Sequence, residues 1–477
     1  MSTDATLSSE AAPTHDARRF RRVLLGTVLT LAVLVTVLGF AGAAQGPRAT
    51  SAEIDTTRSV QMAGQTLRIE LNQAVKQVDA AAVAVSPAVP VSVTHDASTL
   101  IVTFEKPLKY SRDYTVTIPG VIGAFTSSPS TITQTFRTAD DYVYSLQRRS
   151  HDGELDAVLR RPLDRAGDQE IVFRAPHIKS FARHGDAVVA VTVNEDGTNS
   201  VFIAQPGTDA PQEITFPTVG HVRALAASHT NPLLGFVVTS TEVNGERKFE
   251  NALFTLDLSG AVETGVKLVE NAQGEPVRVM DWAFVPGAMS VVVQDHEQTL
   301  FLVDLAGVSP ITPVGRHAEL RGFIPGTTTL VVADPDHSSL IDLAEGTTTT
   351  IELPASELAT DRYIGKVTVL GTDGEHLLEL SSPASDVSSL ATNSVLALVA
   401  NGSSSSLYAP AESSRILRHC VSPNGQFAAV ETIGASSVPD RYPGNPGFTD
   451  TLMYIVEIDS ARVVAGLNGG FSDWCGA

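Results

Sequence analysis

Cysteine is almost absent from this chain of 477 residues, which contains only Cys420 and Cys475. No Cys-x-x-Cys motif is present. In an exported protein, two such cysteines fit one structural disulfide better than metal binding or thiol catalysis.

The sequence also lacks the short motifs of common enzyme classes. The serine-hydrolase elbow Gly-x-Ser-x-Gly, the zinc motif His-Glu-x-x-His and the phosphate-cradling Gly-x-x-x-x-Gly-Lys are missing. Tryptophan occurs only at Trp282 and Trp474, and the 12 histidines are scattered without metal-ligand spacing. We therefore expect a noncatalytic protein with no cofactor and no metal.

Basic residues are in the minority: 33 Lys and Arg stand against 53 Asp and Glu, a formal net charge of −20. Binding to phosphates requires clustered Lys and Arg, so nucleic acid and anionic membrane surfaces are disfavoured as partners of this chain. Because 43% of the residues are hydrophobic, the chain is expected to form real cores rather than to be disordered.

One long apolar stretch, Val23 to Ala44, carries no charge. At about 1.5 Å per residue it is long enough to span the hydrocarbon core of a bilayer. Arg18, Arg19, Arg21 and Arg22 precede it, so the positive-inside rule predicts a cytoplasmic tail at 1–22, a transmembrane helix at 23–44 and an extracytoplasmic remainder. The predicted location is a cell membrane crossed once.

A cleaved signal peptide is the alternative for the same stretch. Ala41-Gly42-Ala43 fits the small-residue pattern of a signal-peptidase site, although the apolar stretch exceeds the usual core of a signal peptide. We favour a membrane anchor over a cleaved signal peptide, because no later segment of the chain could serve as the anchor instead.

Alternating apolar and polar residues begin near residue 58, after a small, polar segment at 45–57 that is predicted to be a linker. The phrase Pro107–Ile118, followed by Thr135-Phe136-Arg137-Thr138, resembles the C-terminal half of bacterial Ig-like domains of the surface-layer-protein type. The resemblance implies a β-sandwich at 58–139 that acts as a spacer or an adhesion module. Tyr114 would point its ring into the core.

From Asp140 onward one pattern recurs at a period of about 40 residues, which is typical of a β-propeller. Trp282–Val293 aligns with Arg321–Val332, and Cys420–Val430 is a third copy; each predicts a strand, a tight turn and a second strand. The pattern resembles TolB-like and WD-like extracytoplasmic propellers, most closely at Ser422-Pro423-Asn424-Gly425. The resemblance implies a propeller over 140–477. A second repeated phrase predicts that its aspartates accept hydrogen bonds from turn amides: Asp257, Asp304, Asp342 and Asp459.

Both ends of the propeller are predicted to share a seventh blade. Residues 142–177 are predicted to form three strands of a blade that lacks its innermost strand. Phe471–Cys475 is predicted to be an innermost strand, and it has no other strands of its own blade beside it in the sequence. This alignment places Cys420 and Cys475 at equivalent points of adjacent inner strands. A disulfide there would stabilise the fold by on the order of 4 kcal/mol, unless the strands splay too far apart to be bridged.

Two groups of residues are candidates for binding. A long Pro/Gly-rich loop at 439–448 interrupts the last blade and carries possible partner contacts, unless it is only tolerated slack in the chain: Arg441, Tyr442 and Phe448. Charged residues on inner strands are predicted to line the channel mouth, either as a ligand site or as a ring of mutually paired charges: Arg223, Asp281, Arg321, Arg418, His419 and Asp473.

Two acidic clusters have the composition of cation sites. Asp334-Pro335-Asp336-His337 offers carboxylates and an imidazole, and Asn194-Glu195-Asp196-Gly197 resembles an incomplete calcium loop. Both are more simply explained as solvated turns.

The chain is therefore predicted to be all-β apart from a single N-terminal transmembrane helix, with an Ig-like β-sandwich and then a β-propeller of seven blades. The leading hypothesis is a noncatalytic cell-envelope protein that presents the propeller to unidentified envelope proteins. The alternative is a propeller enzyme or small-ligand receptor that uses the channel mouth. Carboxylates converging there would favour the alternative.

Overall fold

The computed structural model describes residues 15–43, 46–124, 128–149, 153–163, 167–205, 210–259, 265–271, 273–382, 394–411 and 413–475. The chain divides into two compact units. The first comprises Met1–Ile54, Thr66–Thr103 and Tyr114–Thr135, and the second comprises Asp55–Gln65, Phe104–Asp113 and Phe136–Ala477.

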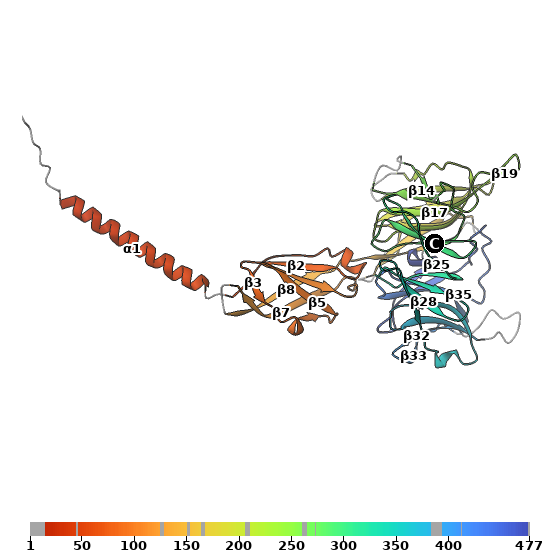
Figure 1. Cartoon of the computed structure of the whole chain (residues 1–477). Helices are drawn as coiled ribbons and strands as arrows, with labels where there is room; N and C mark the ends of the chain where they lie inside the picture. The colour runs from red at the N-terminus through yellow and green to blue at the C-terminus, as the bar shows by residue number, and fades with distance from the viewer. Residues whose placement is uncertain are drawn as a thin grey trace, which may run out of the picture. The chain divides into compact units, whose positions relative to one another are not determined.

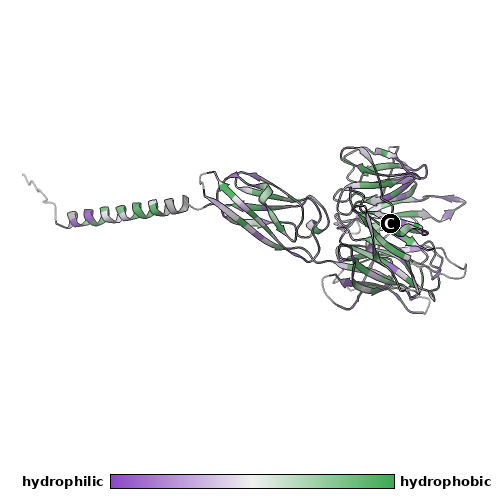
Figure 2. Cartoon of the chain, turned by 90° about the horizontal axis from the view of Figure 1, so that it is seen from below, coloured by the Kyte–Doolittle hydropathy of each residue, from purple (hydrophilic) through white to green (hydrophobic). Residues whose placement is uncertain are grey.

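Helix α1 (His15–Ala43) contains the predicted apolar span except Ala44, which lies outside the described residues. Arg19–Val37 is exposed and, by length and composition, apolar enough to cross a membrane, a test that a signal sequence also passes. The hydroxyl groups of Thr27, Thr30 and Thr36 donate to carbonyl oxygens one turn earlier, at 2.7–3.0 Å, so they remain paired on the apolar surface. Figure 2 shows the hydrophilic start of α1 and the apolar stretch after it.

The first unit is built around a β-sandwich, whose strands run lengthwise in Figure 1. One sheet has the order β1 (Ala49–Glu53), β2 (Thr66–Leu71), β6 (Thr99–Phe104), β5 (Val91–Asp96). The other has the order β3 (Val75–Gln77), β7 (Asp113–Gly123), β4 (Ala84–Ser86), with β8 (Pro129–Arg137) also paired to β7. Alternate side chains of β2, β6 and β7 form the core, including Tyr114, which is buried as predicted.

The segment 45–57, predicted to be a linker, instead contains strand β1. β1 pairs antiparallel with β2, with Ala52 opposite Ile69. Most of its side chains are exposed, because β1 lies at the edge of its sheet and contributes backbone hydrogen bonds rather than apolar surface. An edge strand of this kind has no hydrophobic periodicity, so the sequence pattern does not reveal it.

In its described residues the second unit contains seven sheets of three or four strands that follow one another along the chain, which we call blades 1 to 7. Blade 1 comprises β9 (Tyr142–Gln147), β10 (Asp156–Pro162) and β11 (Glu170–Ala175); blade 2 comprises β12 (Ile178–His184), β13 (Ala187–Val193), β14 (Asn199–Ala204) and β15 (Gln212–Glu213). Blade 3 comprises β16 (Gly220–Ala227), β17 (Leu233–Ser240), β20 (Ala252–Asp257) and β21 (Lys267–Leu268); blade 4 comprises β22 (Val279–Phe284), β23 (Ser290–Asp295), β24 (Thr299–Asp304) and β25 (Thr312–Arg316).

Blade 5 comprises β26 (Glu319–Phe323), β27 (Thr329–Ala333), β28 (Ser338–Asp342) and β29 (Thr347–Ile351). Blade 6 comprises β30 (Tyr363–Val369), β31 (His376–Ser381), β32 (Ser394–Ala400) and β33 (Ser403–Tyr408); blade 7 comprises β34 (Ser414–Val421), β35 (Phe427–Gly434), β36 (Leu452–Glu457) and β37 (Arg462–Asn468). A small hairpin, β18 (Glu242–Val243) and β19 (Glu246–Arg247), projects from blade 3.

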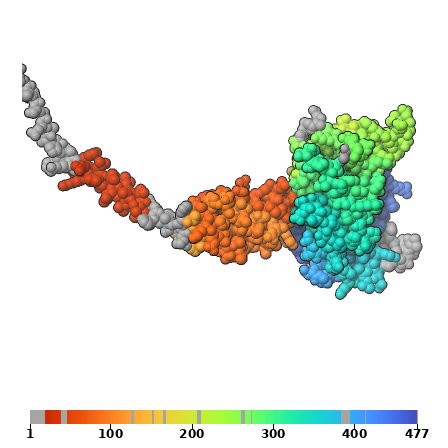
Figure 3. All heavy atoms as spheres, in the orientation of Figure 1, coloured from red at the N-terminus to blue at the C-terminus, as the bar shows by residue number. Residues whose placement is uncertain are grey.

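Apolar side chains between neighbouring blades form the core of this unit. Among the described residues, six clusters join consecutive blades, as when Ile203 of blade 2 packs in one cluster with Phe236 of blade 3. The other five lie between blades 1 and 2, 3 and 4, 4 and 5, 5 and 6, and 6 and 7. In Figure 3 the surface colour changes from green through teal to cyan, because blades adjacent in the chain are adjacent in space. The propeller predicted from the repeat is confirmed.

The repeated phrases mark turns at equivalent places in the blades. Gly287, Gly326 and Gly425 follow the inner strands of blades 4, 5 and 7 with φ of +75°, +69° and +73°, a conformation that glycine adopts without strain. Asp304 accepts hydrogen bonds from the amides of Ala306, Val308 and Ser309, as predicted for the second phrase. Asp257 and Asp342 also accept bonds from turn amides.

Blade 1 is closed by both ends of the propeller, but its inner edge is not a full strand. Gly470 exchanges two backbone hydrogen bonds with Leu146 of β9, at 2.7 and 3.0 Å, and Asp473–Cys475 then forms a short 3₁₀ helix, η6. The predicted strand at 471–475 is therefore wrong. Gly469 and Phe471 both have positive φ, +89° and +55°, which interrupts extended backbone on either side of the bridge.

The predicted disulfide joins Cys420 of β34 to Cys475, with their Cα atoms 5.0 Å apart. Trp474 stacks on Phe427 of blade 7, at 6.4 Å between ring centroids. Phe427 also stacks on Tyr110, at 6.5 Å, and the Tyr110 amide donates to Gln426 Oε1 at 2.9 Å. The C-terminal turn is thus held by one covalent bond and by ring packing.

Candidate functional site

Basic side chains link neighbouring blades around the channel. The inner strands of blades 2 to 7 each contain a register shift, which leaves backbone groups without ladder partners. At four junctions a basic side chain of one blade donates to a carbonyl oxygen of the next: Arg148 Nε to Ile178 (3.1 Å), Lys179 Nζ to Val222 (2.7 Å), Arg223 Nη2 to Val279 (2.5 Å) and Lys366 Nζ to His419 (3.3 Å). We call these four side chains the basic belt.

Burial lowers the pKa of every side chain in the basic belt, because the charged forms lose part of their hydration. The carbonyl oxygens replace some of the lost water and are themselves satisfied. Arg223, one of the residues predicted to line the channel, therefore has a structural role. Sequence reasoning missed the other three, although Lys179 and Lys366 occupy places on their inner strands comparable to that of Arg223.

Arg418, another predicted channel residue, supports the C-terminal turn. Its Nε lies 3.3 Å from Glu431 Oε2, and its guanidinium lies 4.3 Å from the centre of the Phe471 ring. Burial raises the pKa of Glu431, whose Oε2 also accepts the Phe471 amide at 2.8 Å. This pair fixes the backbone where the chain turns after Gly470.

His419 is fully buried between blades 6 and 7. Its Nδ1 lies 3.3 Å from Glu379 and its Nε2 lies 3.1 Å from Thr368 Oγ1. Burial lowers its pKa, an effect that Glu379 opposes. The predicted channel role of His419 is therefore wrong, because its side chain packs between blades instead of facing the channel.

Asp473 belongs to a buried polar cluster that closes the ring. It accepts the Tyr144 amide at 2.9 Å and binds the Arg183 guanidinium, whose Nη2 also lies 3.0 Å from both oxygens of Asp141. Burial alone would lower the pKa of Arg183, but Asp141 and Asp473 raise it well above its ordinary value. The cluster joins η6 to blades 1 and 2, so Asp473 is structural.

Only two of the predicted channel residues, Asp281 and Arg321, line the main channel cavity of about 420 Å³. Glu319, Lys366 and Trp474 line it with them. Arg321 bonds within its own blade, to Glu319 at 3.0 Å and to Ser338 at 3.3 Å. Burial raises the pKa of Asp281, which forms no ion pair within the described residues. In this cavity, Asp281 is therefore a charged group that could bind a ligand.

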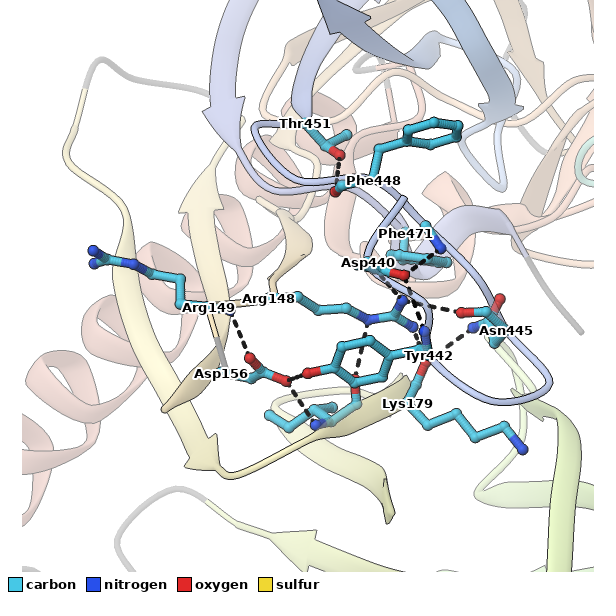
Figure 4. A network of polar contacts seen from close by, with 12 residues as sticks. Arg148, Arg149, Asp156, Lys179, Asp440, Tyr442, Asn445, Phe448, Thr451 and Phe471 are labelled. Atoms are coloured by element: carbon cyan, nitrogen blue, oxygen red, sulfur yellow. Dashed lines mark hydrogen bonds and ion pairs between the residues drawn. The ribbon is translucent and has the colours of Figure 1, made fainter. Parts of the chain in front are cut away.

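The loop at 439–448, which we call the closing loop, packs against blades 1 and 2 (Figure 4). Asp440 binds Arg148 Nη1 at 2.7 Å, and both side chains are almost inaccessible to solvent. The Tyr442 hydroxyl donates to Asp156, and its ring lies 4.0 Å from the Arg148 guanidinium. Asn445 Nδ2 donates to the Lys179 carbonyl at 2.9 Å.

The prediction of three exposed contacts on the closing loop is therefore wrong for Tyr442, which is only 8% exposed. Phe448 is half-buried, with the Arg415 guanidinium 5.6 Å from its ring centre. Arg441 is exposed, and it lines an outer groove together with His177 and Glu195. Pro/Gly-rich composition predicts a loop, but it does not show whether side chains of that loop are buried.

The two acidic clusters form turns. Asp196 Oδ1 accepts the amide and hydroxyl of Thr198, at 2.9 and 2.6 Å, and Gly197 has φ of +83°. Asp334 binds His317 at 2.8 Å, and Asp336 binds His337 at 2.7 Å. Across the described residues, no group of three or more His, Cys, Asp or Glu side chains is arranged to hold a metal ion.

Comparison with known proteins identifies the first unit's fold. A family model of the bacterial Ig-like domain matches residues 44–138. Curated proteins give no match.

Among solved structures, the chain is similar to a putative TolB from Agrobacterium tumefaciens, with 10% identity, coverage of 70% of this chain and 91% of that chain, and a TM-score of 0.32. It is also similar to the β-propeller domain of Cps50 (Swd1) from Myceliophteria thermophila, with 13% identity, coverage of 62% and 88%, and a TM-score of 0.36. A putative 6-phosphogluconolactonase from Bacteroides uniformis has 12% identity, coverage of 69% and 99%, and a TM-score of 0.38. Such distant similarity does not bear on activity. The chain thus carries a bacterial Ig-like domain at residues 44–138 and a β-propeller after it, behind an N-terminal apolar helix.

Proposed function

We propose that this chain is a noncatalytic cell-envelope protein, anchored by α1, whose propeller binds other proteins outside the membrane. The observation that carries the proposal is the basic belt. Four basic side chains of inner-strand junctions donate to backbone carbonyl oxygens of the next blade. These bonds stabilise the ring as a framework, which supports a role in presenting surfaces to partners.

The closures of the ring support the same role. The disulfide, the Arg183–Asp473 cluster and the closing loop each join the end of the propeller to its beginning or to the neighbouring blade. A ring closed in this way presents surface loops on a rigid framework, an arrangement that lowers the entropy cost of binding a partner.

The proposed topology rests on the four arginines that precede the apolar part of α1, because only Arg48 is basic between that part and Arg58. Protease added to cells stripped of their wall should digest residues beyond α1, while mass spectrometry of untreated membranes should recover the intact N-terminus. If the main species is soluble and begins near Ala44, the anchor is wrong and the stretch is a signal peptide.

Protein binding is tested by cross-linking intact cells with a membrane-impermeant reagent and purifying the full-length chain. We expect the same few exported proteins in every replicate, and their absence when an unrelated exported membrane protein of similar acidity is purified as control. Recovery of identical proteins with both baits would contradict a specific binding role.

A second candidate function is small-ligand binding in the channel cavity, and the specific observation in its favour is the pair of carboxylates Asp281 and Glu319 that line it. Native mass spectrometry of the purified protein should then show a co-purifying small molecule that is lost in Asp281→Asn. An unliganded mass for the wild-type protein from cells and from spent medium alike would count against this function.

A further inference from the structure

A groove on the outer part of the propeller lies between blades 3 and 4. Its cavity volume is about 620 Å³, within the range of about 300–1,000 Å³ that is typical of ligand pockets. At this junction β21, the outermost strand of blade 3, is two residues long and β25 of blade 4 is five. Residues of both blades line the groove, among them Asn251 of blade 3 and Phe301 of blade 4.

The floor of the groove is the margin of the apolar core between these blades. Val293 and Val303 belong to that core cluster, and Phe301, Ile311 and Val277 pack against it while remaining half-exposed. These side chains offer a place where an apolar side chain of a partner would lose contact with water.

The wall contributed by blade 3 is held by backbone pairing between described residues. Glu270 pairs with Pro276 and Ala252 pairs with Arg278 through isolated bridges, and the Asn271 amide donates to the Glu275 carbonyl at 2.8 Å. This pairing fixes the part of the wall that carries Glu275 and Arg278, which lowers the cost of ordering it on binding.

The rim carries four carboxylates and one guanidinium. Arg278 pairs with Glu250 at 2.7 Å. Within the described residues, the other three carboxylates have no basic ion-pair partner: Glu275, Asp295 and Glu297. Asp295 is partly used by its own turn, where it accepts the amides of Glu297 and Thr299. Glu275 and Glu297 thus present exposed negative charge beside an apolar floor.

We propose that the groove between blades 3 and 4 binds a short segment of a protein partner, in which an apolar side chain is flanked by Lys or Arg. The apolar side chain would rest on Phe301 and Ile311, and the basic side chains would pair with Glu275 and Glu297. This inference deepens the proposed function and rests on it. It specifies the surface and the charge of the partner segment.

The test uses two fluorescent nonapeptides with the same central Leu and Phe, one flanked by lysines and the other by glutamates. Fluorescence anisotropy with the purified full-length protein should show binding of the basic peptide only, weakened by added salt. The double variant Glu275→Gln, Glu297→Gln should bind about three- to tenfold more weakly, as expected for the loss of two exposed ion pairs. Ile311→Ser should also weaken binding, with its melting temperature measured to confirm folding.

The matched control is Asp336→Asn with Glu345→Gln, which removes two exposed carboxylates from blade 5. Its affinity should stay within twofold of wild type. If the control pair weakens binding equally, the affinity of the basic peptide depends on the net charge of the protein alone. That result would overturn the groove assignment. Competition by free spermidine as strong as that by the unlabelled peptide would overturn the protein-segment assignment in favour of a small cation.

Failure of the groove and failure of the proposed function are distinguishable. If the groove variants leave the cross-linked partners of the intact cell unchanged, the groove is wrong while protein binding stands. If the cells yield no specific partner, the proposed function itself is wrong.

Discussion

At the scale of single residues, the buried ion pair between Arg148 and Asp440 is expected to have a large effect on stability. Both side chains are almost inaccessible, and Arg148 also donates to backbone carbonyl oxygens of blade 2. Removing one partner of such a pair leaves an uncompensated charge in the interior, which costs more than the pair itself contributes.

We therefore expect Arg148→Met to lower the free energy of unfolding by about 3–5 kcal/mol, measured by denaturant titration. The matched control is its neighbour Arg149→Met, which removes only an exposed pair with Glu154 and should cost less than about 1 kcal/mol. Similar values for both variants would show that the closing loop contributes little to the fold.

His229 provides a pH-dependent prediction. Burial, reinforced by the nearby Arg183, lowers its pKa from 6.5 to about 4. Between these values the unfolded chain binds a proton that the folded chain does not, so the contribution of His229 should destabilise the fold as the pH falls from about 6.5 to about 4. Above that window the imidazole is neutral in both states and has no effect.

The measurement is the melting temperature across this pH range. His229→Gln should show a shallower loss of stability on acidification than wild type, whereas His221→Gln, which changes an exposed histidine, should follow wild type. A His229→Gln curve parallel to that of wild type would mean that other groups carry the acid sensitivity.

At the scale of elements, the basic belt determines how inner strands meet. Lys179→Met removes the bond to the Val222 carbonyl, which would leave that oxygen unpaired at the junction of blades 2 and 3. We expect a loss of about 1–3 kcal/mol and faster hydrogen exchange in β16, detected by mass spectrometry. Arg321→Met is the control, since Arg321 bonds within its own blade, and it should leave exchange in β30 unchanged.

The C-terminal turn gives a second prediction at this scale. Cys475→Ser removes the disulfide, whose expected contribution is about 2–4 kcal/mol. The variant should still fold, because the Gly470 bridge and the Asp473 cluster remain, but protease should release its C-terminus sooner. Cleavage at the wild-type rate would show that the disulfide is dispensable for closure.

Most elements were predictable because the physics that forms them is local. Alternating burial marks strands such as β2 and β6, and glycines at positive φ mark the repeated hairpins. Strand β1 gives no sequence signal because its side chains face solvent, and the strand predicted at 471–475 does not form because Phe471 has a positive φ. The basic belt is not predictable from the sequence because its bonds join side chains to backbone oxygens of another blade, which produces no short-range pattern.

At the scale of the whole molecule, the inside of the propeller ring and its outer surface differ in how their charged groups are paired. The closures and the basic belt use charged groups inside the ring, while the outer groove between blades 3 and 4 keeps carboxylates without basic ion-pair partners in the described residues. An acidic groove with an apolar floor is suited to binding a basic protein segment, while the channel cavity keeps Asp281 without an ion pair in the described residues.

The central claim is tested most directly by photo-cross-linking in living cells, with a photoreactive amino acid placed in full-length chains at His296 in the groove or at Arg321 in the channel cavity. We predict discrete adducts of exported proteins from position 296 and no protein adducts from position 321. Protein adducts from position 321 alone, with none from position 296, would contradict the proposal and place recognition in the channel.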